Sequence, residues 1–133
     1  ANGVHCVRVS SDGFVYVCDR QNHRFQIFQR DGTYVKEVFL AAKVGDGRSA
    51  WDIEFSRDAG QTFFYDTDAE NRKVWILRRN SMEVVGSFGR GGGHGVGQFY
   101  GAHSLAIDSK GNAYVGETYE GKRVQKFVRT GGR

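Results

Sequence analysis

The chain has 133 residues, of which 39% are hydrophobic and 14% aromatic, and its 19 basic and 15 acidic residues give a formal net charge of +4. This length holds one small domain or part of a larger one, and the composition is that of a globular fold. No apolar run approaches the roughly 20 residues that span a bilayer, and the N-terminus lacks the pattern of a secretion signal. We therefore expect a soluble domain, of unknown compartment, that binds neither membranes nor nucleic acid.

Short β-strands are predicted along the whole chain, because apolar and polar residues alternate and β-branched and aromatic residues are frequent. In chain order, the strands are expected within residues 7–28, 34–40, 53–77, 83–89 and 105–127. Nineteen glycines and no proline fit many tight turns between these strands. No stretch has the length and periodicity of an amphipathic helix, so the predicted fold class is all-β.

The strand pattern repeats three times, starting at Val7, Ile53 and Leu105. Four short strands in about 40 to 50 residues are the unit of a β-propeller blade. We expect blade 1 at about 5–50, blade 2 at about 51–102, and blade 3 at about 103–133 without its outer strand. The glycine-rich segment 89–101 is predicted to be a long connection between blades, because no helix follows it to complete a phosphate-binding loop.

The segments "YVCDRQNHRFQIFQRDG" (16–32) and "GNAYVGETYEGKRVQKF" (111–127) resemble NHL repeats, and "DAENRKVWIL" (68–77) keeps their core. This resemblance covers nearly the whole chain and implies a propeller, commonly of six blades. The first two repeats each have a carboxylate, an asparagine and a basic residue around one turn, where they are expected to pair as scaffold. These sets are Asp19, Asn22 and Arg24 in the first repeat, and Asp68, Asn71 and Lys73 in the second.

Three blades are too few to close a ring, since propellers close with about four to eight. The two outer blade faces of an open arc would leave apolar side chains in water, which a soluble monomer seldom does. We therefore predict a homodimer in which two half-propellers form a six-bladed ring. The alternative is that the chain is a fragment of a longer propeller.

Cys6 and Cys18 fall on neighbouring predicted strands around the turn "SSDG". If Val9 lies opposite Val15, the two cysteines face each other, and a cross-strand disulfide is geometrically allowed. Because two cysteines do not make a disulfide framework, a reduced and half-buried pair is expected.

His5, Trp51 and His103 occupy equivalent positions at the start of the innermost strand of each blade, where the chain enters the mouth of the central channel. In the dimer, His5 and His103 of both chains would place four imidazoles around the two-fold axis. Such a set is suited to binding a divalent metal, most of all zinc. The alternative is that the two histidines only form hydrogen bonds in a water-filled channel. The turns between second and third strands should surround the same mouth, bringing Asp19, Arg20, His23, Glu117 and Tyr119 there. No ligand role is expected for His23 or for His94.

The segments "CDRQNHRFQIF" and "GETYEGKRV" also resemble blades of the peptidyl-hydroxyglycine amidating lyases, six-bladed propellers that hold a catalytic zinc with histidines at inner-strand starts. This resemblance implies ligand roles for His5 and His103 and a catalytic role for Tyr119. The second blade has Trp51 and Asp52 in place of a histidine.

Other six-bladed propellers, such as paraoxonases and gluconolactonases, hydrolyse esters, lactones or phosphotriesters at a central metal. By this analogy of fold we expect a metal-dependent hydrolase of broad specificity that acts on a small-molecule substrate. Asp52 is the candidate general base or extra ligand, and the substrate-binding candidates are Trp51, Tyr100 and Arg20, with Tyr119 also able to orient the substrate. The alternatives are a non-catalytic NHL scaffold that binds a protein or peptide, and an activity like that of the amidating lyases.

Overall fold

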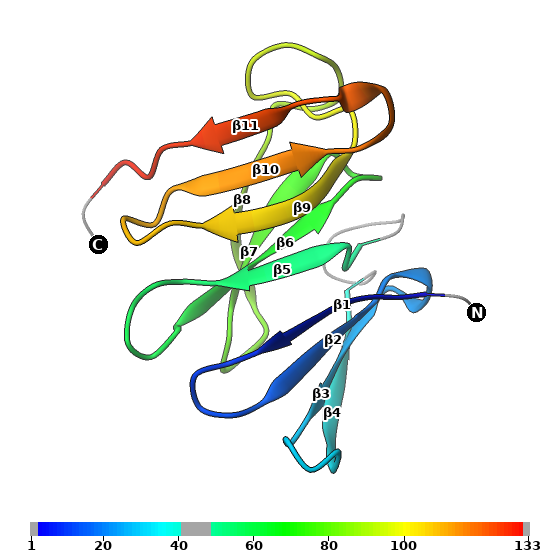
Figure 1. The fold of residues 1–133 in the computed structure, drawn as a ribbon, viewed down its shortest axis with the longest axis vertical. Coiled ribbons are helices and arrows are strands. Elements are labelled where there is room, and N and C mark those ends of the chain that lie inside the picture. The colour runs from blue at the N-terminus through cyan, green and yellow to red at the C-terminus, as the bar shows by residue number, and fades with distance from the viewer. Residues whose placement is uncertain (1–2, 41–48, 132–133) are drawn as a thin grey trace.

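The computed structural model describes residues 3–40 and 49–131, which form three antiparallel sheets side by side (Figure 1). The first sheet, blade 1, has the order β1-β2-β3-β4, with β1 at Val4–Val9, β2 at Val15–Asp19, β3 at Arg24–Phe28 and β4 at Tyr34–Phe39. Blade 2 has the order β5-β6-β7-β8, with β5 at Asp52–Phe55, β6 at Phe63–Asp68, β7 at Lys73–Arg78 and β8 at Val84–Phe88. Blade 3 contains β9 at Ala102–Ile107, β10 at Ala113–Glu117 and β11 at Val124–Phe127.

The all-β prediction is confirmed for the described residues, whose helical elements are two short 3-10 turns, η1 at Arg20–Asn22 and η2 at Tyr119–Gly121. Within the same residues blade 3 has three strands, as the pattern indicated. None of the helical elements found there has the length and apolar character needed to cross a membrane.

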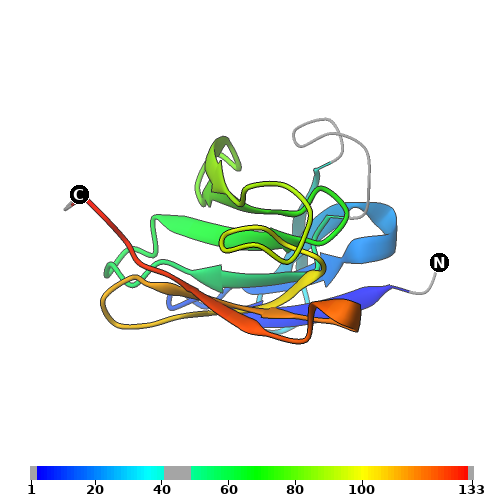
Figure 2. The ribbon, with the colours of Figure 1, turned by 90° about the horizontal axis from the view of Figure 1, so that it is seen from above.

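The inner strands β1, β5 and β9 lie next to one another, and all three run from right to left in Figure 1. Their first residues therefore gather at one end of the molecule, together with the turns that hold η1 and η2. Figure 2 shows both of these turns again on the right-hand side. We call this the mouth end; the turns between first and second strands lie at the opposite end.

The register between β1 and β2 is the predicted one, with Val9 opposite Val15 and Cys6 opposite Cys18. The expectation of reduced cysteines is wrong, because the structure joins Cys6 and Cys18 in a disulfide. The physical reason is the register, which brings the two Cα atoms to 4.8 Å, within bridging distance.

Two apolar layers hold the blades together. Between blades 1 and 2, Tyr16 packs edge-on against Phe55 and Phe25 against Phe64, with ring centroids 5.1 and 5.4 Å apart. Between blades 2 and 3 the buried layer is made of smaller side chains and one phenylalanine: Val74, Ala102, Leu105, Ile107, Ala113, Val115 and Phe99. Each large side chain buried in this way contributes about 1.5–3 kcal/mol, so the two layers dominate the cohesion of the arc.

The outer face of blade 1 stays open to solvent. Val7 and Val9 on β1 are 51% and 54% exposed. Cys6, on the same strand, is buried against blade 2. On β11 of blade 3, Val124 is 69% exposed. The sheet faces that would meet further blades are therefore uncovered in this chain, as the blade count predicted.

The carboxylates at the turns between second and third strands act as scaffold. Asp19 accepts hydrogen bonds from Asn22 Nδ2 at 2.9 Å and from Arg24 Nε at 2.8 Å, as predicted. Burial raises the pKa of Asp19, but these hydrogen bonds outweigh it and lower the pKa overall. In blade 1 the predicted set is confirmed.

Blade 2 keeps the carboxylate and the asparagine but changes the third partner. Asp68 accepts hydrogen bonds from Asn71 Nδ2 at 2.7 Å and from Trp75 Nε1 at 2.8 Å. The predicted pairing of Asp68 with Lys73 is wrong, because the indole takes that place and the Lys73 ammonium lies 5.7 Å from the Trp75 ring centroid. In blade 3 the corresponding carboxylate, Glu117, pairs with Arg123.

Candidate functional site

The rings of His5, Trp51 and His103 form one cluster at the mouth end, each ring coming from a different blade. The centroids of His5 and His103 are 4.8 Å apart, and each lies 5.4 Å from Trp51, in edge-on geometry. Because the three inner strands start side by side, equivalent positions of three repeats meet here. The predicted convergence of these residues is confirmed.

The imidazole of His5 has a fixed orientation. Its Nδ1 lies 2.6 Å from the main-chain carbonyl oxygen of Trp51. A carbonyl oxygen can only accept, so Nδ1 of His5 carries a proton and donates this hydrogen bond. Burial, and to a smaller extent the electrostatic interaction with His5, lower the pKa of His103, which favours its neutral ring. His103 is thus suited to act as a neutral electron-pair donor, and Nε2 is the nitrogen of His5 that the hydrogen bond to Trp51 leaves unused.

A cavity of about 250 Å³ lies beside these rings, among residues of the inner strands. We call it the axial cavity, and its lining consists of residues from all three inner strands: His5, Cys6, Val7, Arg8, Trp51, Asp52, His103 and Ser104. It therefore holds both candidate metal ligands and the candidate general base.

Asp52 uses both of its carboxylate oxygens within the chain. Oδ1 accepts hydrogen bonds from Arg8 Nη2 at 2.7 Å and from the main-chain N–H of Ile53 at 3.0 Å, and Oδ2 accepts one from the N–H of Leu105 at 3.0 Å. Burial nevertheless raises the pKa of Asp52, against the opposing effect of these hydrogen bonds and of Arg8. These contacts give Asp52 an inter-blade structural role; whether it also takes part in catalysis stays a prediction.

A second cavity, of about 300 Å³, opens on the mouth end around Trp51. This mouth cavity is lined by residues of all three blades: Arg20, Trp51, Ala69, Glu70, Arg72, Tyr100, Gly101 and Tyr119. The structure thus brings together four residues that the sequence nominated, Arg20, Trp51, Tyr100 and Tyr119. Trp51 borders both cavities and is only 4% exposed, and the guanidinium carbon of Arg20 lies 4.4 Å from its ring centroid.

Two charged residues of the mouth cavity were missed from the sequence, Glu70 and Arg72. Both lie in the β6–β7 turn, which is the blade 2 equivalent of the turn that carries Arg20. The repeat itself was the signal that could have found them, since the same turn supplied the candidates in blades 1 and 3.

Glu117 was expected at the mouth, but it does not line the mouth cavity. Its side chain is fully buried and accepts hydrogen bonds from the main-chain N–H of Tyr100 at 2.7 Å and from Gln125 Nε2 at 2.9 Å, besides its ion pair with Arg123. Burial alone would raise the pKa of Glu117. The hydrogen bonds from Arg123, Tyr100 and Gln125 outweigh burial, so the pKa is lowered overall. Glu117 therefore anchors the end of the glycine-rich connection, which is the segment that presents Tyr100.

The remaining candidates stay outside both cavity linings. Asp19 is 5% exposed and is bound within its own blade. The Nδ1 atom of His23 is buried and has no hydrogen-bond partner among the described residues. His94 is exposed, stacks on Tyr100 at 4.9 Å, and its Nε2 lies 3.0 Å from the carbonyl oxygen of Glu120. No ligand role was expected for either histidine.

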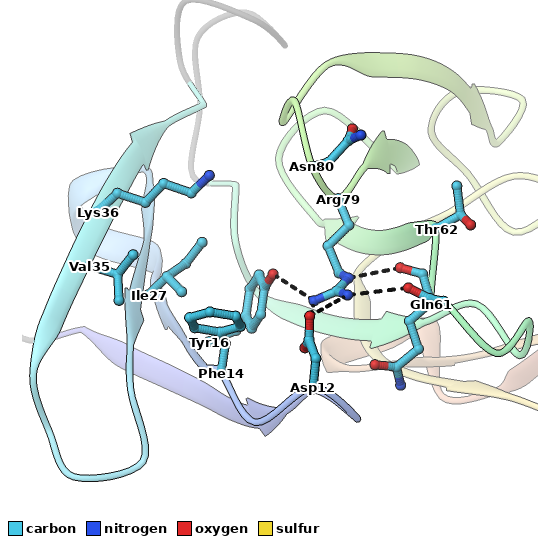
Figure 3. Close-up of a pocket in the computed structure, with 11 residues that line it drawn as sticks. Asp12, Phe14, Tyr16, Ile27, Val35, Lys36, Gln61, Thr62, Arg79 and Asn80 are labelled. Atoms are coloured by element: carbon cyan, nitrogen blue, oxygen red, sulfur yellow. Dashed lines mark hydrogen bonds and ion pairs between the residues drawn. The ribbon is translucent and has the colours of Figure 1, made fainter.

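A third cavity, of about 360 Å³, lies at the opposite end between blades 1 and 2 (Figure 3). Arg79 crosses it and donates to both oxygens of Asp12 at 2.9 and 2.8 Å, to the Tyr16 hydroxyl at 3.3 Å and to the carbonyl of Gln61 at 2.8 Å. The hydrogen bond from Arg79 lowers the pKa of Asp12 to about 2. Because the guanidinium already has these acceptors, we interpret this cavity as part of the scaffold.

The comparisons with known proteins agree with this fold. A family model described as NHL repeat matches residues 2–28. A candidate 6-phosphogluconolactonase from Bacteroides uniformis superposes with a TM-score of 0.71 at 15% identity, over 96% of this chain and 37% of that one. No curated protein matches the sequence.

Two lyases show the same likeness. A streptogramin B lyase gives a TM-score of 0.66 at 17% identity, over 93% of this chain and 37% of that one. Virginiamycin B lyase from Staphylococcus aureus gives 0.63 at 12% identity, over 96% of this chain and 42% of that one. At such identities the likeness shows the fold alone, and this chain spans well under half the length of each of these structures. Three blade-like sheets, a match to the NHL repeat over residues 2–28 and these superpositions together show a partial β-propeller fold whose first blade contains an NHL repeat.

Proposed function

We propose that this chain supplies one half of a metal-dependent hydrolase that acts on esters, lactones or phosphotriesters. In this proposal His5 and His103 bind the divalent ion, for which zinc is the first candidate. The observation that carries this proposal is the convergence of two imidazoles from alternate blades at the mouth, with centroids 4.8 Å apart.

The geometry of the two imidazoles fits a shared ion. With zinc–nitrogen bonds of about 2.0–2.1 Å, two imidazoles on one tetrahedral zinc have their centroids roughly 5 Å apart. The Nδ1–H of His5 is held by the carbonyl of Trp51, a contact of the kind that orients ligating histidines. The lowered pKa of His103 keeps its ring in the neutral form that binding requires.

The remaining ligands would come from outside this chain. Among residues 3–40 and 49–131, no group of three or more His, Cys, Asp or Glu side chains gathers as a metal site. We propose that a second copy completes the ring and adds its own His5 and His103 around the two-fold axis. The exposed Val7 and Val9 on the open face of blade 1 support this, because a neighbouring blade would bury them.

A divalent ion at this site would supply an activated water and polarise the carbonyl or phosphoryl oxygen of the substrate. The chain's own residues would bind and orient that substrate. Tyr100 and Tyr119 line the mouth cavity, and Arg20 and Trp51 form its wall next to His103. Asp52 lies in the axial cavity and would act there as a base or as a further ligand.

The test combines metal analysis with hydrolysis of 4-nitrophenyl acetate, a small lactone and a 4-nitrophenyl phosphotriester. His5→Ala and His103→Ala should each lose bound zinc and activity about 100-fold or more. His94→Ala is the matched control for metal binding, since this histidine lies on an exposed loop away from His5 and His103, and it should retain bound zinc. Unchanged activity in both His5→Ala and His103→Ala would end the proposal.

The assembly is tested separately by light scattering at micromolar concentration. The proposal expects twice the 14.9 kDa mass of one chain. A monomeric mass, with zinc present and absent, would refute the dimer.

A non-catalytic scaffold for a protein or peptide is the second candidate, and the full engagement of Asp52 in inter-blade contacts favours it. Under this reading zinc neither binds nor raises the melting temperature. A peptide ending in hydroxyglycine, added to the assay panel, tests the lyase-like alternative.

A further inference from the structure

Arg20 and Arg72 reach the mouth cavity from the turns of two different blades without an acidic partner. Among the described residues, neither guanidinium lies within 4.0 Å of a carboxylate, although Glu70 lines the same cavity. Six other arginines of the chain do have such partners: Arg8, Arg24, Arg57, Arg78, Arg79 and Arg123. The cavity therefore brings together two arginines that have no carboxylate partner among the described residues.

The guanidinium of Arg20 is held in place by stacking. Its carbon lies 4.4 Å from the ring centroid of the buried Trp51, which restricts the side chain to one orientation. Its Nε is buried and has no hydrogen-bond acceptor among the described residues. A buried donor without an acceptor costs free energy that a bound anion would recover.

The guanidinium of Arg72 lies against the glycine-rich connection. A Cβ added to Gly92 would fall 2.2 Å from Arg72 Nη1, so an alanine there would require this guanidinium to move. Arg72 itself has a left-handed backbone, with φ of 58°. This conformation carries strain for a non-glycine residue, and it directs the side chain toward the third blade.

Two tyrosines line the cavity with the arginines, Tyr100 from the glycine-rich connection and Tyr119 from blade 3. Tyr100 is 43% exposed and Tyr119 is 68% exposed, so both rings offer apolar surface to a ligand. The backbone that presents Tyr100 is fixed by the carboxylate of Glu117 at 2.7 Å. Cationic donors and exposed aromatic rings thus line the same 300 Å³ cavity.

We propose that the mouth cavity is a subsite for the anionic group of an aryl-bearing ligand, a carboxylate or a phosphate. Arg20 and Arg72 bind the oxygens, as guanidinium groups do with planar or tetrahedral oxyanions. Tyr100 and Tyr119 contact the aromatic part. The inference rests on the proposed function in one respect, because it takes this ligand to be the substrate, whose reacting bond would lie toward His103.

The test measures binding to the full chain in the presence of a chelator, so that no metal contributes. The probes are 3-phenylpropionate and phenyl phosphate, with 3-phenylpropanol as the uncharged analogue. Binding is measured by calorimetry and by tryptophan fluorescence, to which Trp51 and Trp75 both contribute. Both anions should bind, and the alcohol should bind at least about tenfold more weakly because it cannot accept charge-assisted hydrogen bonds. Equal affinity for the alcohol and the anions would overturn the proposal.

Arg20→Gln and Arg72→Gln should each weaken anion binding about tenfold. Arg30→Gln is the matched control, since it removes the same charge from an exposed turn at the opposite end. Gly92→Ala is a second variant that changes no charge, yet it should displace the Arg72 guanidinium and weaken binding as Arg72→Gln does. Arg20→Gln and Arg72→Gln proteins that bind the anions as tightly as the unaltered chain would also overturn the proposal.

Failure of this subsite and failure of the proposed function are distinguishable. If the anions bind through the arginines while no ester, lactone or phosphotriester is hydrolysed, the subsite stands and the hydrolase does not. If hydrolysis depends on His5 and His103 while Arg20→Gln and Arg72→Gln affect charged and neutral substrates equally, the hydrolase stands and the subsite is refuted.

Discussion

Arg8 and Asp52 form a 2.7 Å ion pair across the boundary between blades 1 and 2, and the same carboxylate accepts the main-chain N–H of Leu105 in blade 3. One side chain thereby joins the inner strands of all three blades. Thr67 adds a parallel link, since its hydroxyl donates to the carbonyl of His103 at 2.8 Å. The relative positions of the rings at the mouth depend on these links.

We expect Asp52→Ala to destabilise the chain by about 3 kcal/mol, because it leaves the half-buried Arg8 guanidinium and the N–H of Leu105 without their acceptor. Asp52→Asn, which keeps an acceptor oxygen, should cost less. Urea denaturation followed by circular dichroism measures both, with Asp31→Ala in an exposed turn as the control. An Asp52→Ala protein that loses hydrolysis but keeps its urea midpoint would show that the role of Asp52 is catalytic and not structural.

The disulfide between Cys6 and Cys18 closes a short loop, with a sequence separation of 12. Its loss should lower the free energy of unfolding by about 2–3 kcal/mol. The measurement compares melting with and without dithiothreitol, and a Cys6→Ser, Cys18→Ser double variant should melt like the reduced protein. Alkylation of both thiols in the native protein without reductant would contradict the bond.

Asp66 is fully buried, and burial together with the nearby charges of Asp68 and Asp52 raises its pKa well above 3.8. Since the folded-state pKa lies above the unfolded value, the contribution of Asp66 to stability is full below pH 3.8 and is lost as pH rises through the folded-state pKa. Asp66→Asn should therefore gain stability over the unaltered chain as pH increases.

Urea midpoints of the two proteins across the acidic to alkaline range measure this difference. Asp31→Asn is the control of opposite sign, because hydrogen bonds from Thr33 lower the pKa of Asp31. A difference between Asp66→Asn and the unaltered chain that shrinks with rising pH would contradict the prediction.

Asp12 has a folded-state pKa of about 2, below the ordinary value of 3.8, mainly through its hydrogen bond to Arg79. Its contribution is present above pH 3.8 and is lost as pH falls through about 2. Arg79→Met should thus lower stability at neutral pH and flatten the loss of stability on acidification between these values. Acid titration of the urea midpoint tests this, and an equally steep acid limb in Arg79→Met would argue against the assignment.

Much of the fold is readable from the sequence, because alternation with a period of two and the threefold repeat are local properties. They predicted the sheets, the pairing of Cys6 opposite Cys18, and the convergence of His5, Trp51 and His103. The convergence followed because equivalent positions of neighbouring blades must meet when the inner strands lie side by side.

Contacts between blades depended on the tertiary structure alone. The spacing of repeats does not specify how closely two blades pack, or which long side chain fills the space between them. This is why Asp52 is tied to Arg8 and Leu105, and why Arg72 lies against Gly92 beside the mouth cavity. The repeat determined which residues face the mouth, whereas packing between blades decided which of them lie without a carboxylate partner among the described residues.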